Sequence, residues 1–262
     1  VCGEFLGADA ADKLGALGLR LPELGALAVT RAILGAGRWR AEFRLPFAAW
    51  SLPRAVRDSA LLDAARGAGA NVVTDAAVRD ASGEGGRWCV TLADGRRLTP
   101  RQLILATGKH ELRGVRRSVR GGAVGVKLLL SGDVPEHAVT LLFCAGGYAG
   151  LQPRPGGGAN LCAALDPRAA GVGDAARSAS HLLAHIASGS RLGETILSRL
   201  TPMSSRPMTI AGVPYGYQHQ GGGPFRVGDQ AAVVPSFCGA GVAMALCSGL
   251  RAAEAIRIGR EP

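Results

Sequence analysis

The sequence lacks any long uninterrupted apolar segment. A helix that crosses a membrane needs roughly twenty consecutive apolar residues, whereas Gly, Pro, Ser and Gln break the longest uncharged runs of these 262 residues. The first residues also lack the basic and then apolar stretches of a secretory signal. We therefore expect a globular cytoplasmic protein with no integral membrane segment, for which 47% hydrophobic residues are ample to form a core.

Spacings typical of metal sites are also missing. None of the six cysteines forms a C-x-x-C pair, and no histidine stands at ligand spacing to a cysteine. These spacings argue against a zinc site or a disulfide scaffold. We predict that the protein holds no metal.

Lysine is scarce, although the formal net charge is +10. Nearly all of the basic charge comes from arginines, which are scattered along the chain apart from one cluster. The members of that cluster are Arg113, Arg116, Arg117 and Arg120. No aromatic residues lie between them to stack on bases, so we expect an exposed turn and no nucleic-acid partner. The alternative is a surface that faces a phosphate-bearing substrate or a nicotinamide cofactor.

No dinucleotide-binding fingerprint stands in its required context. Residues 171–176 fit G-x-G-x-x-A by letter, but no apolar strand precedes them. The motif needs a strand before it and a helix after it. We interpret this segment as a loop in which Asp174 caps the next helix.

The most informative segment lies near the C-terminus. Residues 225–227 predict a short strand, after which Gly228 lets the backbone turn and approach a ligand closely. Asp229 then offers a carboxylate at the carboxyl end of a strand, where open α/β sheets bind ligands. Gly239 and Gly241 begin a helix whose bare N–H groups suit a phosphate or another electron-rich group.

This segment resembles the Gly-Asp motif of FAD-dependent oxidoreductases with the p-hydroxybenzoate-hydroxylase type of fold. In that family the strand and the Gly-Asp pair hold the ribityl chain and pyrophosphate of the flavin, and a Pro-x-x-x-Gly-x-Gly loop lies beside the isoalloxazine ring. Ala240 departs from the family, which usually has a polar or acidic residue there. The residues that the resemblance assigns to the cofactor are Gly228, Asp229, Pro235, Gly239, Ala240 and Gly241.

The first residues carry a second resemblance. Val1-Cys2-Gly3-Glu4-Phe5-Leu6 is similar to the segment after the second strand of geranylgeranyl-reductase-like flavoproteins. In those proteins a βαβ unit with G-x-G-x-x-G precedes it and holds the adenosine diphosphate end of FAD. The resemblance implies that a unit of about thirty residues is missing upstream, and so an N-terminally incomplete Rossmann-like domain.

Two internal segments extend the resemblance. Arg54 begins a helix where family members bring an arginine to the flavin, although Arg54 and Asp58 also suit an ordinary surface helix. Thr107 and Gly108 end a buried strand, like the Ala-Thr-Gly segment that closes on the cofactor in flavin disulfide reductases. Aromatic hydroxylases of this fold have Asp-Gly there, and that aspartate serves flavin and NADPH. Lys109, directly after, suits either the pyrophosphate or a solvent-facing turn.

Periodicity predicts an α/β (α+β) fold in which helices and strands alternate. Helices are expected at 8–17, 54–67, 175–187, 192–200 and from 241 onward. Strands are expected at 26–34, 38–45, 71–78, 88–92, 97–98, 103–106, 123–130, 139–144, 148–152, 159–165 and 208–213. Asp94-Gly95 predicts a hairpin turn, and alternation places Trp39, Ala41, Phe43 and Leu45 on one face of their strand.

The family resemblance, applied to the order of these elements, implies two domains. A discontinuous FAD-binding domain takes residues 1–120 and 208–262, with some substrate-domain strands near 26–46. Residues 121–207 form an inserted antiparallel β-sheet, the predicted substrate domain. The family resemblance implies that this domain packs over the flavin ring.

The resemblances imply an FAD-dependent oxidoreductase with a small-molecule substrate and NAD(P)H as a candidate electron donor. A reductase of isoprenoid-like chains competes with a monooxygenase of aromatic or polyketide substrates. The Cys-Gly-Glu start and Thr107 in place of the aspartate favour the reductase. No residue is identified as catalytic, because the flavin carries the chemistry. The alternative to an enzyme is a cofactor-free remnant that binds a partner or an apolar ligand. The sequence predicts no oligomeric state.

Overall fold

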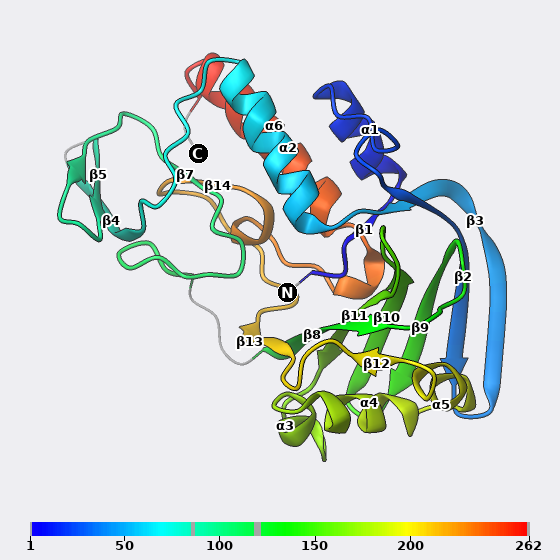
Figure 1. Ribbon diagram of the computed structural model, residues 1–262. Helices are drawn as coiled ribbons and strands as arrows, with labels where there is room; N and C mark the ends of the chain where they lie inside the picture. The colour runs from blue at the N-terminus through cyan, green and yellow to red at the C-terminus, as the bar shows by residue number, and fades with distance from the viewer. Residues whose placement is uncertain (1, 85–86, 118–121, 261–262) are drawn as a thin grey trace. The chain divides into compact units, whose positions relative to one another are not determined.

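The computed structural model describes residues 2–84, 87–117 and 122–260 (Figure 1). The chain divides into two compact units. Unit 1 comprises Val1–Leu61 and Gly121–Val213, and unit 2 comprises Leu62–Arg120 and Pro214–Pro262. None of the helices in the described ranges has the length and apolar character needed to span a bilayer.

Unit 1 is built on one nine-stranded mixed sheet. Its strands are β1 (Phe5–Leu6), β2 (Leu27–Ala36), β3 (Trp39–Ser51), β8 (Ala123–Ser131), β9 (Ala138–Cys144), β10 (Gly147–Pro153), β11 (Ala159–Leu165), β12 (Thr201–Pro202) and β13 (Met208–Val213). The strand order is β1-β3-β2-β9-β10-β11-β8-β12, and β13 also pairs with β8. The β2–β9 pair is parallel and the other pairs are antiparallel.

The core of unit 1 lies between one face of this sheet and three helices, α3 (Val172–Ala175), α4 (Ala179–Ala187) and α5 (Arg191–Leu197) (Figure 1). Alternate side chains of β8 to β11 point into this core, as the strand period of two requires. The fully buried ones include Leu128, Leu130, Leu142, Leu151, Leu161 and Leu165.

The helices of unit 1 differ from the predicted ones at their ends. The helix expected over 175–187 begins only at Ala179 as α4, because Ser178 has an extended backbone and its side chain accepts the His181 N–H. The short α3 overlaps the expected range only at Ala175. Asp174 lies inside α3, so its predicted capping role is wrong. Likewise Ser190 caps α5 by accepting the Gly193 N–H at 3.0 Å, and α5 ends at Leu197.

The hairpin of β2 and β3 is longer than predicted and has an exposed apolar face. Its register pairs Ala32 with Phe43 and Ala36 with Trp39. Trp39 and Phe43 are 71% and 48% exposed. Pairing is regular over residues 39–44, which keeps Trp39, Ala41 and Phe43 on one face, and an irregularity between Val29 and Arg31 shifts the register only beyond Arg44.

Two further helices begin close to the predicted positions. These are α1 (Ala8–Ala16) in unit 1 and α2 (Arg54–Gly67), which starts in unit 1 and crosses the division at residue 61. The division places residues 1–61 with the large sheet. The assignment of a cofactor role and a substrate role to the two domains stays a prediction.

Unit 2 contains two small sheets and one long helix. An antiparallel sheet joins β4 (Val78–Glu84), β5 (Arg87–Leu92) and β6 (Arg97–Leu98), and a parallel pair joins β7 (Ile104–Leu105) to β14 (Phe225–Arg226). The helix α6 (Gly241–Arg257) packs with Ala252 against Phe225 and Val227. The predicted hairpin is confirmed between β5 and β6, where Gly95 has a φ of 89°.

The strand predicted over 71–78 is wrong. β4 begins only at Val78, and residues 71–77 pair with no strand among the described residues. Val73 is 61% exposed, and Asp75 has a φ of 58°, which interrupts an extended backbone. Apolar β-branched residues alone do not make a strand where no neighbour pairs with them.

Candidate functional site

The candidate site lies in unit 2, at the carboxyl ends of β7 and β14. The two strands are parallel and adjacent, since the Phe225 N–H donates to the Leu103 carbonyl at 2.9 Å and the Val227 N–H to the Leu105 carbonyl at 3.1 Å. Their carboxyl ends therefore lie side by side. The segment 107–110 follows one strand and the turn 228–230 follows the other, so the structure brings these predicted residues together.

The Gly228 position requires glycine for two reasons. Its φ of 58° lies in the left-handed region, which side chains other than that of glycine adopt at a cost. A Cβ built there would stand 3.2 Å from the Cβ of Ala245 in α6. The Gly228 N–H also donates to Ser248 Oγ at 2.8 Å, so the turn that carries Asp229 is fixed directly on α6.

Asp229 forms an ion pair with Lys109. The carboxylate Oδ2 lies 2.6 Å from the Lys109 Nζ, and each side chain is 24% exposed. Lys109 is therefore neither at a free surface turn nor separate from the Gly-Asp motif. Lys109 thus holds the Asp229 carboxylate, which the resemblance assigns to the cofactor. From the sequence alone, Lys109 suits either the pyrophosphate or a solvent-facing turn.

Arg117 is buried, so the interpretation of its cluster as an exposed turn is wrong for this residue. Its side chain is 1% exposed, and its Nε lies 2.6 Å from Glu111 Oε1. Nη1 donates to the Asp229 carbonyl at 2.5 Å and Nη2 to the Lys109 carbonyl at 3.2 Å. The neighbouring Arg113 and Arg116 are exposed, as expected. Arg120 lies outside the described residues.

Gln230 is a second residue that sequence analysis missed. Its buried Nε2 donates to the carbonyls of Gly108 and His110, at 3.0 and 2.8 Å. Its Oε1 accepts from Arg226 Nη1 at 2.9 Å. Gln230 thus ties the segment after β7 to the turn after β14. Its position directly after the Gly-Asp pair is the feature of the sequence that could have identified it as a site residue.

The loop from Pro235 to Gly241 leads into α6 with little side-chain cover. Gly239 has a φ of 65°, whereas Gly241 does not need a positive φ. The helix begins at Gly241 with no side-chain cap on its N-terminus. Tyr215 Oη lies 2.7 Å from Ser236 Oγ and braces the start of the loop.

These residues leave local space at the backbone and N–H groups suited to an anion. A Cβ built at Gly108 or Gly241 would meet no atom within 4 Å, so both backbones are open to close approach by a ligand. The uncapped start of the 17-residue α6 leaves N–H groups available to an anion. The candidate cofactor residues of unit 2 are Thr107, Gly108, Gly228, Asp229, Pro235, Gly239, Ala240 and Gly241.

Arg54 lies in unit 1 at the start of α2. Its Nε bonds to Asp58 Oδ2 at 2.7 Å, and its backbone N–H donates to Glu4 Oε1 at 3.2 Å. Burial tends to raise the pKa of Asp58, but hydrogen bonds from Arg54 and Arg57 outweigh burial and hold that pKa below its usual value. These contacts explain the local structure, and the role of Arg54 toward a cofactor stays a prediction.

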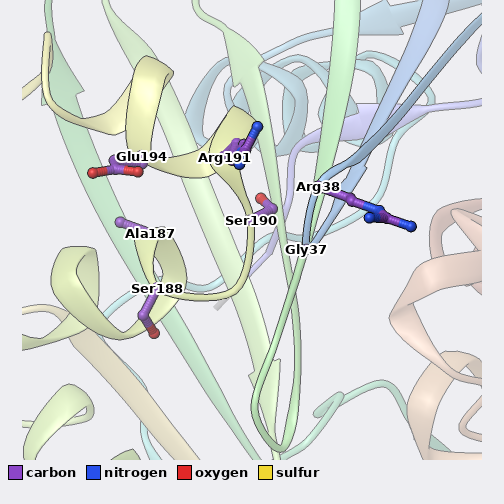
Figure 2. Close-up of a pocket in the computed structure, with 7 residues that line it drawn as sticks. All are labelled: Gly37, Arg38, Ala187, Ser188, Ser190, Arg191 and Glu194. Carbon is purple, nitrogen blue, oxygen red and sulfur yellow. The ribbon is translucent and has the colours of Figure 1, made fainter.

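A shallow pocket of about 400 Å³ in unit 1 does not coincide with any predicted site residue. It is lined by Gly37, Arg38, Ala187, Ser188, Ser190, Arg191 and Glu194. Figure 2 shows that the side chains of Arg38, Ser188 and Glu194 point in different directions instead of converging on one point. No group of three or more His, Cys, Asp or Glu residues suited to a metal ion occurs in the part of the chain that the structure describes.

Comparison with solved structures identifies the fold. No protein-family model matches the sequence, and no curated protein matches it. A myxobacterial chondrochloren halogenase, a variant of FAD-dependent halogenases, matches with a TM-score of 0.80 and 19% identity over 98% of this chain and 65% of its own. A geranylgeranyl bacteriochlorophyll reductase-like protein from Thermoplasma acidophilum matches with a TM-score of 0.74 and 18% identity over 99% and 69%.

A probable FAD-dependent monooxygenase from Pseudomonas aeruginosa also matches, with a TM-score of 0.68 and 16% identity over 97% of this chain and 77% of its own. The chain thus spans 65% to 77% of the length of these three structures. It has the fold of FAD-dependent oxidoreductases, as the sequence resemblance implied.

Proposed function

We propose that the chain is a cytoplasmic FAD-dependent oxidoreductase that holds its flavin at the carboxyl ends of β7 and β14. The observation that carries this proposal is the Gly228-Asp229 turn, fixed on α6 beside the open backbone of Gly108. The same turn occupies the ligand-binding edge of a parallel strand pair. The fold of the chain supports the same cofactor.

Each residue of the site has a distinct role in this proposal. Asp229 accepts hydrogen bonds from the ribityl hydroxyls, and Thr107 and Gly108 line the same edge. Pro235, Gly239, Ala240 and Gly241 present backbone to the ring, and the N-terminus of α6 faces electron-rich atoms. Bound FAD supplies the hydride or oxygen chemistry. Arg54, at the start of α2, is a further proposed cofactor residue.

The proposed reaction is reduction of a small apolar or isoprenoid-like substrate, with NAD(P)H as donor. The Cys2-Gly3-Glu4 start and Thr107 in place of an aspartate support this assignment. Residues 121–207 are the proposed substrate domain. The competing proposal is a monooxygenase of aromatic or polyketide substrates.

Anaerobic reoxidation separates the two reactions. Flavin reduced on the protein without oxygen is mixed with geranylgeraniol, and its absorbance is followed. Reoxidation by the isoprenoid alone supports the reductase. Reoxidation that requires dioxygen and is accelerated by an aromatic substrate supports the monooxygenase.

The Asp229→Ala variant tests the cofactor site itself. A hydrogen bond to a charged group contributes roughly 1.5–3 kcal/mol, so the dissociation constant for FAD should rise about 10- to 150-fold in a fluorescence titration. Glu254→Ala, which removes an exposed carboxylate from α6, should leave FAD affinity unchanged. Equal affinity of the two variants, with melting temperatures like that of the parent, refutes the assignment. A parent chain that binds no FAD supports the cofactor-free class.

A further inference from the structure

Arg117 joins the two segments that carry Lys109 and Asp229. We propose that it is the positioning residue of the site and sets Asp229 and Lys109 against each other in the ion pair. The relevance of this arrangement to a cofactor rests on the proposed function, but the arrangement itself does not. Lys109 follows β7 and Asp229 follows β14, and they lie 120 residues apart in the sequence.

The guanidinium of Arg117 uses each of its nitrogens for a different contact. Nε bonds to Glu111, Nη1 to the Asp229 carbonyl and Nη2 to the Lys109 carbonyl. The Arg117 N–H also donates to Glu111 Oε2 at 3.0 Å. The ring of Tyr217 lies 5.4 Å from the guanidinium carbon, within cation–π range. A single side chain thus fixes the peptide groups of both members of the ion pair.

Only arginine can make this set of contacts. Its planar fork presents donors in fixed directions, whereas the lysine ammonium is a single point charge on a flexible stem. The charge is also well compensated, because a buried cation is costly unless it is paired and hydrogen-bonded. The two carbonyl contacts do not neutralise charge, so their effect is to fix position.

Fixing the two carbonyls limits where the two side chains can go. Asp229 lies in a three-residue turn from Gly228 to Gln230, so the orientation of its peptide group strongly limits the direction of its carboxylate. Lys109 has a flexible side chain whose amine reaches that carboxylate at 2.6 Å. Without Arg117 the Gln230 contacts still tie the two segments together, but nothing fixes the Asp229 and Lys109 carbonyls against each other, and the Lys109 amine is released to solvent.

Amine acylation tests this prediction without any flavin. The chain has three lysines, Lys13, Lys109 and Lys127, so the rate at each can be followed by peptide mass spectrometry after treatment with sulfo-N-hydroxysuccinimide acetate. In Arg117→Met the rate at Lys109 relative to Lys13 should rise about fivefold, the factor equivalent to about 1 kcal/mol of ion pairing. Arg116→Met, at the exposed neighbour, should leave this ratio unchanged.

If Arg117→Met does not fold, Arg117→Lys replaces it in the acylation experiment. It keeps the positive charge near Glu111 but loses the two carbonyl contacts, so the same rise at Lys109 is expected. An unchanged ratio of Lys109 to Lys13 in a folded Arg117 variant overturns the proposal. A rise at Lys127 of the same size also overturns it, because that lysine lies in unit 1 and would report general loosening.

FAD affinity connects the positioning role to the proposed function. If both hold, Arg117→Lys and Asp229→Asn should weaken FAD binding by less together than the product of their separate factors. Weaker binding in Asp229→Asn alone, with Arg117→Lys unchanged in both affinity and Lys109 acylation, leaves the function standing and removes the positioning role. A rise in Lys109 acylation in a chain that binds no FAD leaves the positioning role standing alone.

Discussion

Glu4 is a buried acidic residue with a backbone conformation unusual for its type. Its φ is 62°, its Oε1 lies 2.5 Å from Lys127 Nζ, and the same oxygen accepts the Arg54 N–H. The Asn160 side chain holds the preceding residues by donating to the Cys2 and Gly3 carbonyls. A left-handed non-glycine residue persists only where its surroundings determine it. Here those surroundings are β8, β11 and the start of α2.

The Glu4–Lys127 pair predicts a large and non-additive loss of stability. Lys127→Met leaves the Glu4 carboxylate buried without its cation, which should lower the free energy of unfolding by about 3–5 kcal/mol in urea denaturation. Glu4→Gln together with Lys127→Met removes both charges and should cost less than the sum of the single variants. Additive losses would show that the two residues do not act as a pair. Lys13→Met, on α1, is the control.

For single residues, the sequence predicts which residues belong to the candidate site but not their hydrogen-bond and ion-pair partners. Gly228, Asp229 and Gly108 were identified because a motif concentrates them at strand ends. Arg117 was assigned to solvent because its burial depends on the Asp229 carbonyl, 112 residues away. The pairing of Lys127 with Glu4 is equally remote, at 123 residues. Composition and local spacing do not reveal such contacts.

The N-terminal turn of α2 shows how an element depends on one carboxylate. Asp58 bonds to both Arg54 and Arg57, and its pKa lies below the usual value although burial opposes this shift. The unfolded chain then binds protons more readily than the folded one. The carboxylate therefore contributes stability above about pH 4, and this contribution is lost as the pH falls through the folded pKa.

The Asp58→Asn variant should consequently lose stability at neutral pH and lose less on acidification. We expect the difference in free energy of unfolding between parent and variant to shrink as urea titrations move from pH 7 to below about pH 4. Asp63→Asn, an exposed position in the same helix, is the matched control. A difference for Asp58→Asn that stays constant over this range would contradict the assigned cause.

Among the elements, those with a strong local pattern were predicted well. The hairpin at Asp94-Gly95 follows from its turn residues, and β8 to β11 follow from their apolar alternation. The segment 71–77 failed because its valines have no neighbouring strand among the described residues. The helix predicted over 175–187 begins only at Ala179, because Ser178 acts as its N-cap.

For the molecule as a whole, the exposed apolar side chains and the unpaired edge of β3 are expected to lower solubility. Trp39, Phe43 and Phe47 are all exposed, and no strand in the described ranges pairs with the outer edge of β3 before Trp50. Exposed apolar edge strands favour pairing between molecules. The net charge of +10 opposes such contacts, so this repulsion should matter most at low salt.

We therefore expect the protein to self-associate as salt is raised, and Phe43→Lys to prevent this. Sedimentation velocity at low and high salt would measure the weight-average mass. The substitution should change the free energy of unfolding by no more than about 0.5 kcal/mol, because the side chain is largely exposed. Met203→Lys, another exposed apolar position, is the control. Equal association of all three proteins at high salt would exclude the β3 edge as its cause.

The parallel pairing of β2 with β9 has a consequence for synthesis. Arg31 pairs with Ala138 and donates to the Glu136 carbonyl 105 residues later. At about 5–20 residues per second, a ribosome makes β9 roughly 5 to 20 seconds after β2. During this interval the β2 edge of the nascent hairpin is unpaired, and closing so long a loop is slow. We therefore expect the β2–β3 hairpin to depend on chaperones that bind emerging polypeptides until β9 has been made.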